Sequence, residues 1–98
     1  MNQTLSVTFG QCVRALRQEQ GWTQVTFSER CGFYQTYLSR IENGQANPTL
    51  NAMEVIASGL GLTIFQLFDR VRLNAEPALA ASEATAGQIA SLADGASK

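Results

Sequence analysis

The sequence predicts a compact all-α domain of five short helices, followed by a short alanine-rich C-terminal tail. Up to about Asn74, apolar residues recur every three or four positions, which is the spacing of one helix face. Threonines, which are typical of helix starts, and glycines, which are typical of helix ends, punctuate these apolar stripes. No segment alternates cleanly with the period of two that a half-buried strand requires. Five helices with links of a few residues indicate a compact bundle.

The first helix is predicted at about 8–20. Thr8 and Gln11 have the spacing of a capping box, in which each side chain bonds to a free backbone N–H of the first turn. Gly21 provides the stop. A weak alternation over residues 4–9 could instead make an extended N-terminal arm. The inner face of this helix consists of Phe9, Cys12, Val13 and Leu16.

The second and third helices are predicted at about Gln24–Cys31 and Gln35–Asn43. Thr23 is placed to cap the second helix, and Gly32 and Gly44 follow the two helix ends. Both starts also have the pattern of a hydrophobic staple, an apolar residue before the cap and another at the fourth helical position. The staple pairs are Trp22 with Phe27 and Phe33 with Leu38, and the inner face of the third helix consists of Leu38 and Ile41.

The fourth and fifth helices follow a turn at residues 47–48. Thr49 caps the fourth helix. Thr63 and Gln66 form a second capping box, from which the fifth helix runs to about Arg70. The stripe of the fourth helix is Met53, Ile56, Ala57 and Leu60, its end is Gly61, and the staple of the fifth helix is Leu62 with Leu67.

Residues 1–73 are predicted to form one domain, and residues 74–98 a separate tail. Nine of the 25 tail residues are alanine, and three, Leu79, Ile89 and Leu92, are large and apolar. So few apolar side chains bury little surface. We therefore expect the tail to be disordered, or to become helical on a partner.

The composition excludes several classes of function. The chain has no histidine, which removes His-based acid–base catalysis, His-dependent triads and most zinc sites. Two cysteines are too few for a disulfide scaffold. No apolar run approaches the roughly 18 residues of a membrane span, and no signal-peptide pattern opens the chain. A cytoplasmic protein with no membrane partner, no metal and no other cofactor is expected.

The net charge of −1 is unevenly distributed. Residues 1–73 carry six arginines against five acidic residues, a balance of +1, and residues 74–98 carry three acidic residues against one lysine, a balance of −2. Neither value indicates a partner by itself. An enzyme is not expected, because the candidate groups Ser39, Glu54 and Asp69 fall on different predicted helices without a base–nucleophile pattern.

The second and third helices are joined by a tight turn that contains glycine, which is the helix-turn-helix arrangement, here at about residues 23–43. The second helix of such a unit enters the major groove of DNA. The stretch from Phe9 to Phe68 resembles the phage-repressor/Cro-type (Xre-family) helix-turn-helix domain. The matching segments are FGQCVRALR at 9–17, WTQ at 22–24, CGF at 31–33, YLSRIENG at 37–44, NPTL at 47–50, IASGLGL at 56–62 and FQLF at 65–68.

The resemblance implies a lambda-repressor-like fold and a DNA-binding transcriptional regulator, such as a repressor. It also implies that Gln24 binds a backbone phosphate and braces the first side chain of the recognition helix, and that Asn43 binds phosphate. Tyr34 stands where the family usually has a Ser or Thr N-cap, and a tyrosine cannot cap the helix in the same way. The DNA-binding residues expected are Gln24, Tyr34, Gln35, Thr36, Ser39, Arg40 and Asn43.

The third helix presents Gln35, Thr36, Ser39 and Arg40 opposite its inner face. Gln35 can pair with adenine and Arg40 with guanine, or Arg40 can contact a phosphate. Tyr37 either packs on the second helix or touches DNA, while Arg14 and Arg17 are solvated or structural. The residues expected in the core are Trp22, Phe27, Phe33 and Phe65, together with the thiols of Cys12 and Cys31 as buried, inert groups.

The expected assembly is a homodimer on a palindromic operator, because one helix-turn-helix reads few base pairs. Its predicted surface is the fifth helix, which carries the apolar residues Ile64, Phe65, Leu67 and Phe68, and the tail could contribute. An antitoxin or restriction-controller role, with a protein partner on the tail, is the alternative.

Overall fold

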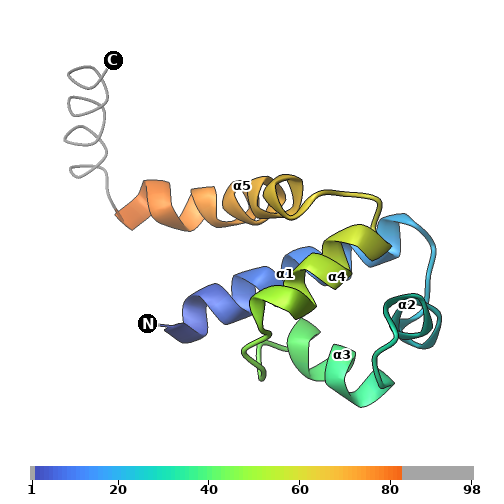
Figure 1. Cartoon of the computed structure of the whole chain (residues 1–98). Coiled ribbons are helices and arrows are strands. Elements are labelled where there is room, and N and C mark those ends of the chain that lie inside the picture. The colour runs from blue at the N-terminus through green and yellow to red at the C-terminus, as the bar shows by residue number, and fades with distance from the viewer. Residues whose placement is uncertain (1, 83–98) are drawn as a thin grey trace.

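In the computed structural model, the backbone of residues 2–82 and the side chains of residues 5–75 are described. This part of the chain forms five helices and no strand, which confirms the all-α prediction. The helices are α1 (Asn2–Glu19), α2 (Gln24–Cys31), α3 (Gln35–Glu42), α4 (Leu50–Gly59) and α5 (Ile64–Ser82). Figure 1 shows α1 and α4 overlapping at the centre of the view, α5 across one side, and α2 and α3 together at the opposite end. The first helix packs mainly against α3 and α5, and α4 packs against α5 and α2.

The first helix begins at Asn2, so the predicted start at Thr8 is wrong. Thr8 lies inside α1 and cannot cap it, and residues 4–9 are helical rather than an extended arm. Tertiary contacts account for the extra turns. The Ser6 hydroxyl donates to Asn47 Oδ1 at 3.0 Å, and the backbone of Gly44 packs closely against Val7. The loop between α3 and α4 therefore stabilises the first turns of α1.

The predicted starts of α2, α4 and α5 are confirmed by their caps. The hydroxyls of Thr23 and Thr49 accept from backbone N–H groups at 3.1 and 3.0 Å. Thr63 and Gln66 exchange the two hydrogen bonds of a capping box at 2.9 and 3.1 Å. Tyr34 makes no side-chain cap bond at the start of α3, as the sequence predicts.

Two glycines allow the helices to reach their positions. Gly32 ends α2 with φ +75°, a left-handed conformation that other residues rarely adopt, and so turns the chain sharply into α3. Gly10 lies where α1 crosses α3, and a Cβ there would clash with the carbonyl oxygens of Ile41 and Glu42. The missing side chain brings the polar end of α3 within reach of the arginines of α1.

The inner faces predicted for α1, α3 and α4 lie in the core, with Met53 partly buried against it. Phe27, Leu38, Ile56 and Leu67 are fully buried, and Trp22 stacks on Phe27 with ring centroids 5.7 Å apart, as the staple predicts. One expected core residue is wrong, because Phe65 is 77 % exposed. The buried face of α5 is formed by Leu67 and Val71, with Ile64 beside them, and Phe65 lies off that face.

The last helix continues to Ser82 rather than ending near Arg70. Val71 extends the buried stripe by one turn, and the alanine-rich residues that follow favour helix. Residues 74–82 of the predicted tail are therefore helical, while the expectations for residues 83–98 lie outside the described residues. A domain boundary at residue 73 stays a prediction.

No single helix in the described part of the chain is both long and apolar enough to cross a membrane. Leu50–Gly59 and Ile64–Ala75 reach that length and composition when taken together, but they are bent by 92° relative to each other.

Candidate nucleic-acid interface

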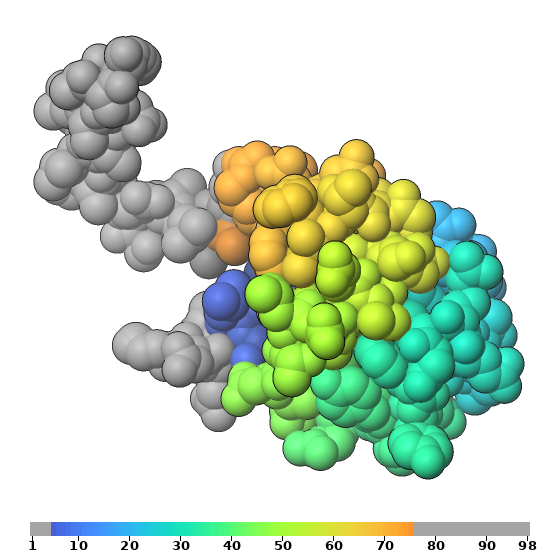
Figure 2. Space-filling view, viewed as in Figure 1, coloured from blue at the N-terminus to red at the C-terminus, as the bar shows by residue number. Residues whose placement is uncertain are grey.

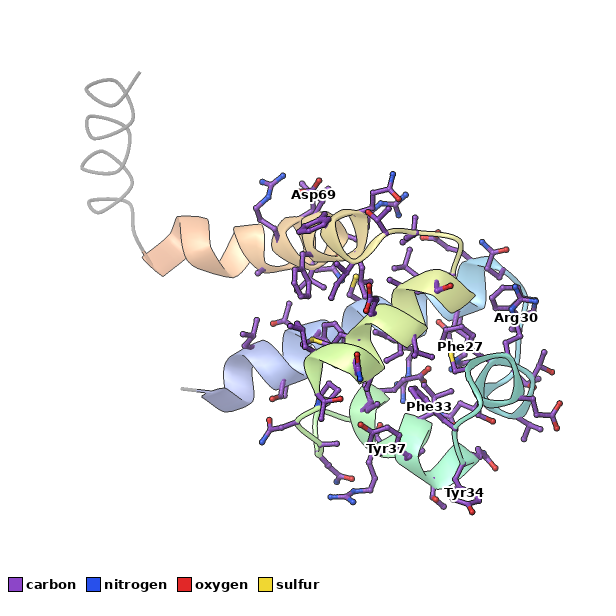
Figure 3. All side chains as sticks on the ribbon, viewed as in Figure 1. Phe27, Arg30, Phe33, Tyr34, Tyr37 and Asp69 are labelled. Atoms are coloured by element: carbon purple, nitrogen blue, oxygen red, sulfur yellow. The ribbon has the colours of Figure 1, made fainter. Side chains whose placement is uncertain are left out.

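The outer face of α3 is polar and open to solvent. Leu38 and Ile41 anchor the helix to the core, with exposed fractions of 0 % and 1 %. The residues predicted to bind DNA from this element gather on the opposite side or at its ends: Tyr34, Gln35, Thr36, Arg40 and Asn43 are exposed and Ser39 is half-buried. Figure 3 shows Tyr34 at the outer tip where α3 begins. The structure thus brings the predicted residues to one surface.

Behind this surface lies a buried ion pair that the sequence analysis missed. The Glu42 carboxylate, with a fully buried side chain, accepts from Arg17 Nε at 2.7 Å and from Arg17 Nη2 at 3.0 Å. Arg17 also donates to the carbonyl oxygen of Trp22 at 2.7 Å. One signal could have found the pair: Glu42 follows Leu38 by four positions and therefore belongs to the inner face of α3.

The same carboxylate contacts the predicted DNA-binding surface through Gln24. Gln24 Nε2 donates to Glu42 Oε1 at 3.0 Å, and Gln24 Oε1 accepts from Gln35 Nε2 at 3.3 Å. Gln24 is the first residue of α2 and Gln35 the first of α3, so these bonds join the two helix starts. The contact between Gln24 and Gln35 is the bracing that the family resemblance implies.

Two further residues predicted to bind DNA, Asn43 and Arg40, make hydrogen bonds within the protein. Arg14 Nη2 donates to Asn43 Oδ1 at 3.0 Å, and Arg14 Nε lies 3.5 Å from Glu42 Oε1. Arg40 Nη2 donates to the carbonyl oxygen of Gln45 at 3.2 Å, which keeps its guanidinium near the end of α3. Arg14 and Arg17 are therefore structural, one of the two roles expected for them.

Tyr37 packs against the turn between the two helices. Its ring meets that of Phe33 edge-on, with centroids 5.1 Å apart, and the residue is half-buried (Figure 3). On the far side of α2, the guanidinium of Arg30 lies 4.3 Å from the ring centroid of Trp22 and donates to the carbonyl oxygen of Gly59. The ring contact thus joins α3 to the turn that precedes it, and the contacts of Arg30 join α2 to Trp22 and to the end of α4.

The groups considered for other chemistry are dispersed or unreactive. Ser39, Glu54 and Asp69 lie on three different helices, and Asp69 pairs with Arg72 at 3.6 Å on the surface. Burial raises the pKa of the Cys12 thiol, and it raises the pKa of Cys31 to about 11. Both thiols are therefore protonated at neutral pH and poor nucleophiles.

Comparisons with known proteins agree with this geometry. A protein-family model described as helix-turn-helix matches residues 13–67, more than half of the chain. The chain is 36 % identical over 58 residues to an immunity repressor protein of Bacillus phage phi105; the match covers 59 % of this chain and 40 % of that repressor's length. It is 35 % identical over 68 residues to the control protein C.MunI of a Mycoplasma species, with 68 % of this chain and 92 % of the relative covered.

Solved structures of restriction-modification controllers are similar as well. One is C.AhdI from Aeromonas hydrophila, with a TM-score of 0.62, 33 % identity, and 64 % of this chain and 96 % of the other covered. Another is the C.Esp1396I tetramer in complex with its natural 35 base-pair operator, with a TM-score of 0.67, 26 % identity, and 71 % and 92 % covered.

Proposed function

The chain belongs to the Xre-type helix-turn-helix family of DNA-binding transcriptional regulators, and from this premise we propose that it binds a palindromic operator as a homodimer, with α3 in the major groove. Members of this family regulate transcription and are not enzymes. The observation that carries the proposal is the polar outer face of α3, where Gln35 is held by Gln24 while Leu38 and Ile41 anchor the opposite side.

Base reading is assigned to the exposed polar side chains of α3. Gln35 stands at the N-terminal end of the helix, where this docking mode brings side chains to base edges. Its amide can pair with adenine, and the guanidinium of Arg40 can pair with guanine. Thr36 and Ser39 lie on the same side and complete the reading face.

Contacts to the DNA backbone are assigned to the ends of the two helices. Gln24 is the first residue of α2, so its backbone N–H is one of the unpaired donors that attract phosphate. Asn43 has its amide oxygen occupied by Arg14, which leaves its NH2 group to donate. The hydroxyl of Tyr34, which is 86 % exposed, can reach a further phosphate. Such contacts position the protein without reading sequence.

The homodimer is assigned to α5, with a second copy of this chain as the partner. Phe65, Phe68 and Leu73 are 77 %, 39 % and 52 % exposed. Leu67 is buried in the core, so its predicted place on the dimer surface is wrong. Phe68 also lines a groove of about 610 Å³ that is formed by α1, α5, the loop before α4 and α4 itself. Figure 2 shows the atoms of α5, in orange, close to those near the start of α1, in blue. Its apolar lining includes Leu5, Phe9, Pro48, Met53, Phe68 and Val71. The multimeric state of the similar C.Esp1396I controller supports a partner of the same kind.

A restriction-controller role is the more specific alternative. The match to C.MunI spans 92 % of that control protein, so the similarity covers nearly a whole controller rather than one part of a larger protein. Either a controller or an antitoxin could also bind a protein partner through residues 74–98. In that case, a pull-down of the partner should depend on those residues.

Selection of bound duplexes from a random pool tests the function. We expect the full-length chain to enrich a palindromic site with two half-sites about one helical turn apart. Enrichment that reflects base composition alone, with no defined half-site, would contradict sequence-specific binding. An enriched single half-site would retain the helix-turn-helix assignment and contradict the homodimer.

A further inference from the structure

The carboxylate of Glu42 is the inner end of a chain of hydrogen bonds that reaches the protein surface. It accepts from Arg17 and from Gln24, and Gln24 in turn accepts from Gln35. The two links at Gln24 measure 3.0 and 3.3 Å. The chain begins at a fully buried side chain and ends at an exposed one. We call these three side chains, Glu42, Gln24 and Gln35, the amide relay.

The chemistry of the first link determines how the amide of Gln24 is oriented. An ionised carboxylate accepts hydrogen bonds and donates none, so Gln24 must turn its NH2 group toward Glu42. The reversed amide would set a carbonyl oxygen against a carboxylate oxygen inside the protein, with two acceptors facing each other. The Oε1 atom of Gln24 is therefore directed away from Glu42 and toward α3.

The second link passes this orientation to the recognition helix. Because Gln24 offers an acceptor, Gln35 must use an N–H of its own amide to complete the contact. One N–H and the carbonyl oxygen of Gln35 then remain for DNA. Adenine offers one donor and one acceptor in the major groove, which is the complement of that remaining pair.

Resting on the proposed function, we propose that Glu42 is a positioning residue for base specificity: acting through Gln24, it sets which edge of the Gln35 amide faces the DNA. Gln35 contacts the base, while Glu42 touches no DNA. A free Gln35 can exchange its donor and acceptor by rotating about its last side-chain bond, and so loses preference for one base. The ion pair with Arg17 holds Glu42 in place for this role.

The test compares operator preferences of the full-length protein and three variants, at fixed salt, on a selected operator and its single-base changes. Gln35→Ala identifies the base pair that Gln35 reads. Glu42→Gln replaces the carboxylate by an amide that can present either a donor or an acceptor to Gln24. We expect this variant to lose about tenfold in discrimination at that same base pair, which is about what one bidentate contact to a base contributes. Its preferences at the other base pairs should be unchanged.

Gln24→Met is the third variant, chosen because it removes both links of the relay and leaves the Arg17–Glu42 ion pair intact. It should lose preference at the same base pair, whereas a glutamine that only binds phosphate would, when replaced, weaken all sequences alike. If Glu42→Gln fails to fold, Glu42→Asp replaces it: the charge beside Arg17 is kept, and the carboxylate is withdrawn from Gln24 by one methylene.

Ile56→Val is the matched control, since it loosens the core at a fully buried position of α4 outside the relay. It should lower thermal stability and leave every base preference unchanged. Unchanged discrimination at the Gln35 base pair in a folded Glu42 variant overturns the relay, and so does unchanged discrimination in Gln24→Met. If wild-type protein selects no operator, the proposed function itself fails, and the two failures are thereby distinguished.

Discussion

The carboxylate of Glu42 accepts hydrogen bonds from side chains of α1 and α2, while its own backbone belongs to α3. Its partner Arg17 is 7 % exposed and also bonds to the carbonyl oxygen of Trp22. Since both charges are removed from water, each depends on the other for compensation. The pair thus connects stability with the placement of the exposed residues Gln35 and Asn43.

Loss of one member of this pair should be costly. Arg17→Met leaves the buried carboxylate of Glu42 without its main partner, and we expect the free energy of unfolding to fall by about 3–5 kcal/mol. Urea denaturation followed by circular dichroism measures this change. Arg72→Met, which removes the exposed ion pair with Asp69, is the control and should change stability by less than about 1 kcal/mol. Equal effects of the two variants would contradict the importance of burial.

Arg40 tests the division between base and phosphate contacts. Arg40→Ala should weaken binding to the best operator by about 1–3 kcal/mol and relax the preference at one position in each half-site, if its planar fork reads guanine. Asn43→Ala should instead weaken all sequences alike, because phosphate contacts carry no sequence information. Titrations on the selected operator and its single-base variants separate the two patterns. A uniform loss for Arg40→Ala would reassign that residue to the phosphate backbone.

At the scale of helices, the start of the recognition helix differs from the other starts with a described cap. Thr23 and Thr49 accept hydrogen bonds from the first turns of α2 and α4, and Thr63 does so for α5. Tyr34 occupies the same position before α3 with an extended backbone, φ −72° and ψ 146°, and its side chain points into solvent. The first turn of α3 therefore lacks a bond that the neighbouring helices have.

A better cap at this position should stabilise the protein. In Tyr34→Ser the hydroxyl can accept from the backbone N–H of Thr36, or share that of Tyr37, which already donates to the carbonyl oxygen of residue 34 at 3.1 Å. We therefore expect the free energy of unfolding to rise by up to about 1 kcal/mol. Little packing is lost, because Tyr34 is 86 % exposed. Thr49→Ala, which removes an existing cap, should lower stability by about the same amount. Thermal unfolding of both variants tests this, and a destabilised Tyr34→Ser would show that Tyr34 has contacts that a cap cannot replace.

At the scale of the whole molecule, the described core is complete before the last turns of α5. Its buried cluster runs from Phe9 to Val71, and the four helices α1 to α4 all contribute to it with the first part of α5. The exposed apolar side chains Phe65 and Leu73 belong to α5, and Figure 1 shows α5 on the side of the domain opposite α3. In the proposed homodimer, this separation leaves α3 accessible while the second copy covers α5.

Truncation tests whether the tail is needed for folding. A chain that ends at Leu73 retains every residue of the buried cluster, so its melting temperature should fall by less than about 4 °C, the shift that corresponds to ~1 kcal/mol in a domain of this size. Differential scanning calorimetry of the full and shortened chains makes the comparison. A much larger decrease would mean that residues beyond 73 pack on the domain or on a partner copy.

A charge on α5 should disrupt the proposed dimer. Phe65→Glu places a carboxylate on the exposed apolar surface of α5, and we expect this variant to sediment as a monomer. Its melting temperature should stay close to that of wild-type protein diluted until it is monomeric. Val25→Glu adds the same charge at an exposed site on α2 and should remain dimeric. Sedimentation of wild-type protein as a monomer, with and without operator DNA, would contradict the homodimer.

The sequence by itself determined the helix starts at Thr23, Thr49 and Thr63, because a cap depends on residues within one turn of each other. The stripes that form the core and the glycine turn between α2 and α3 are equally local signals. The outward face of α3 followed from placing Leu38 and Ile41 inside. These local rules account for most of the fold and for the grouping of the expected DNA-binding residues on one surface.

Tertiary structure alone decided the features that depend on distant segments. The early start of α1 depends on the loop containing Asn47, and the burial of Glu42 depends on Arg17, which is 25 positions away in the chain. The exposure of Phe65 depends on which side of α5 meets the core. Free energies of burial and ion pairing are set by neighbours in space, so no local pattern shows them before the helices are packed together.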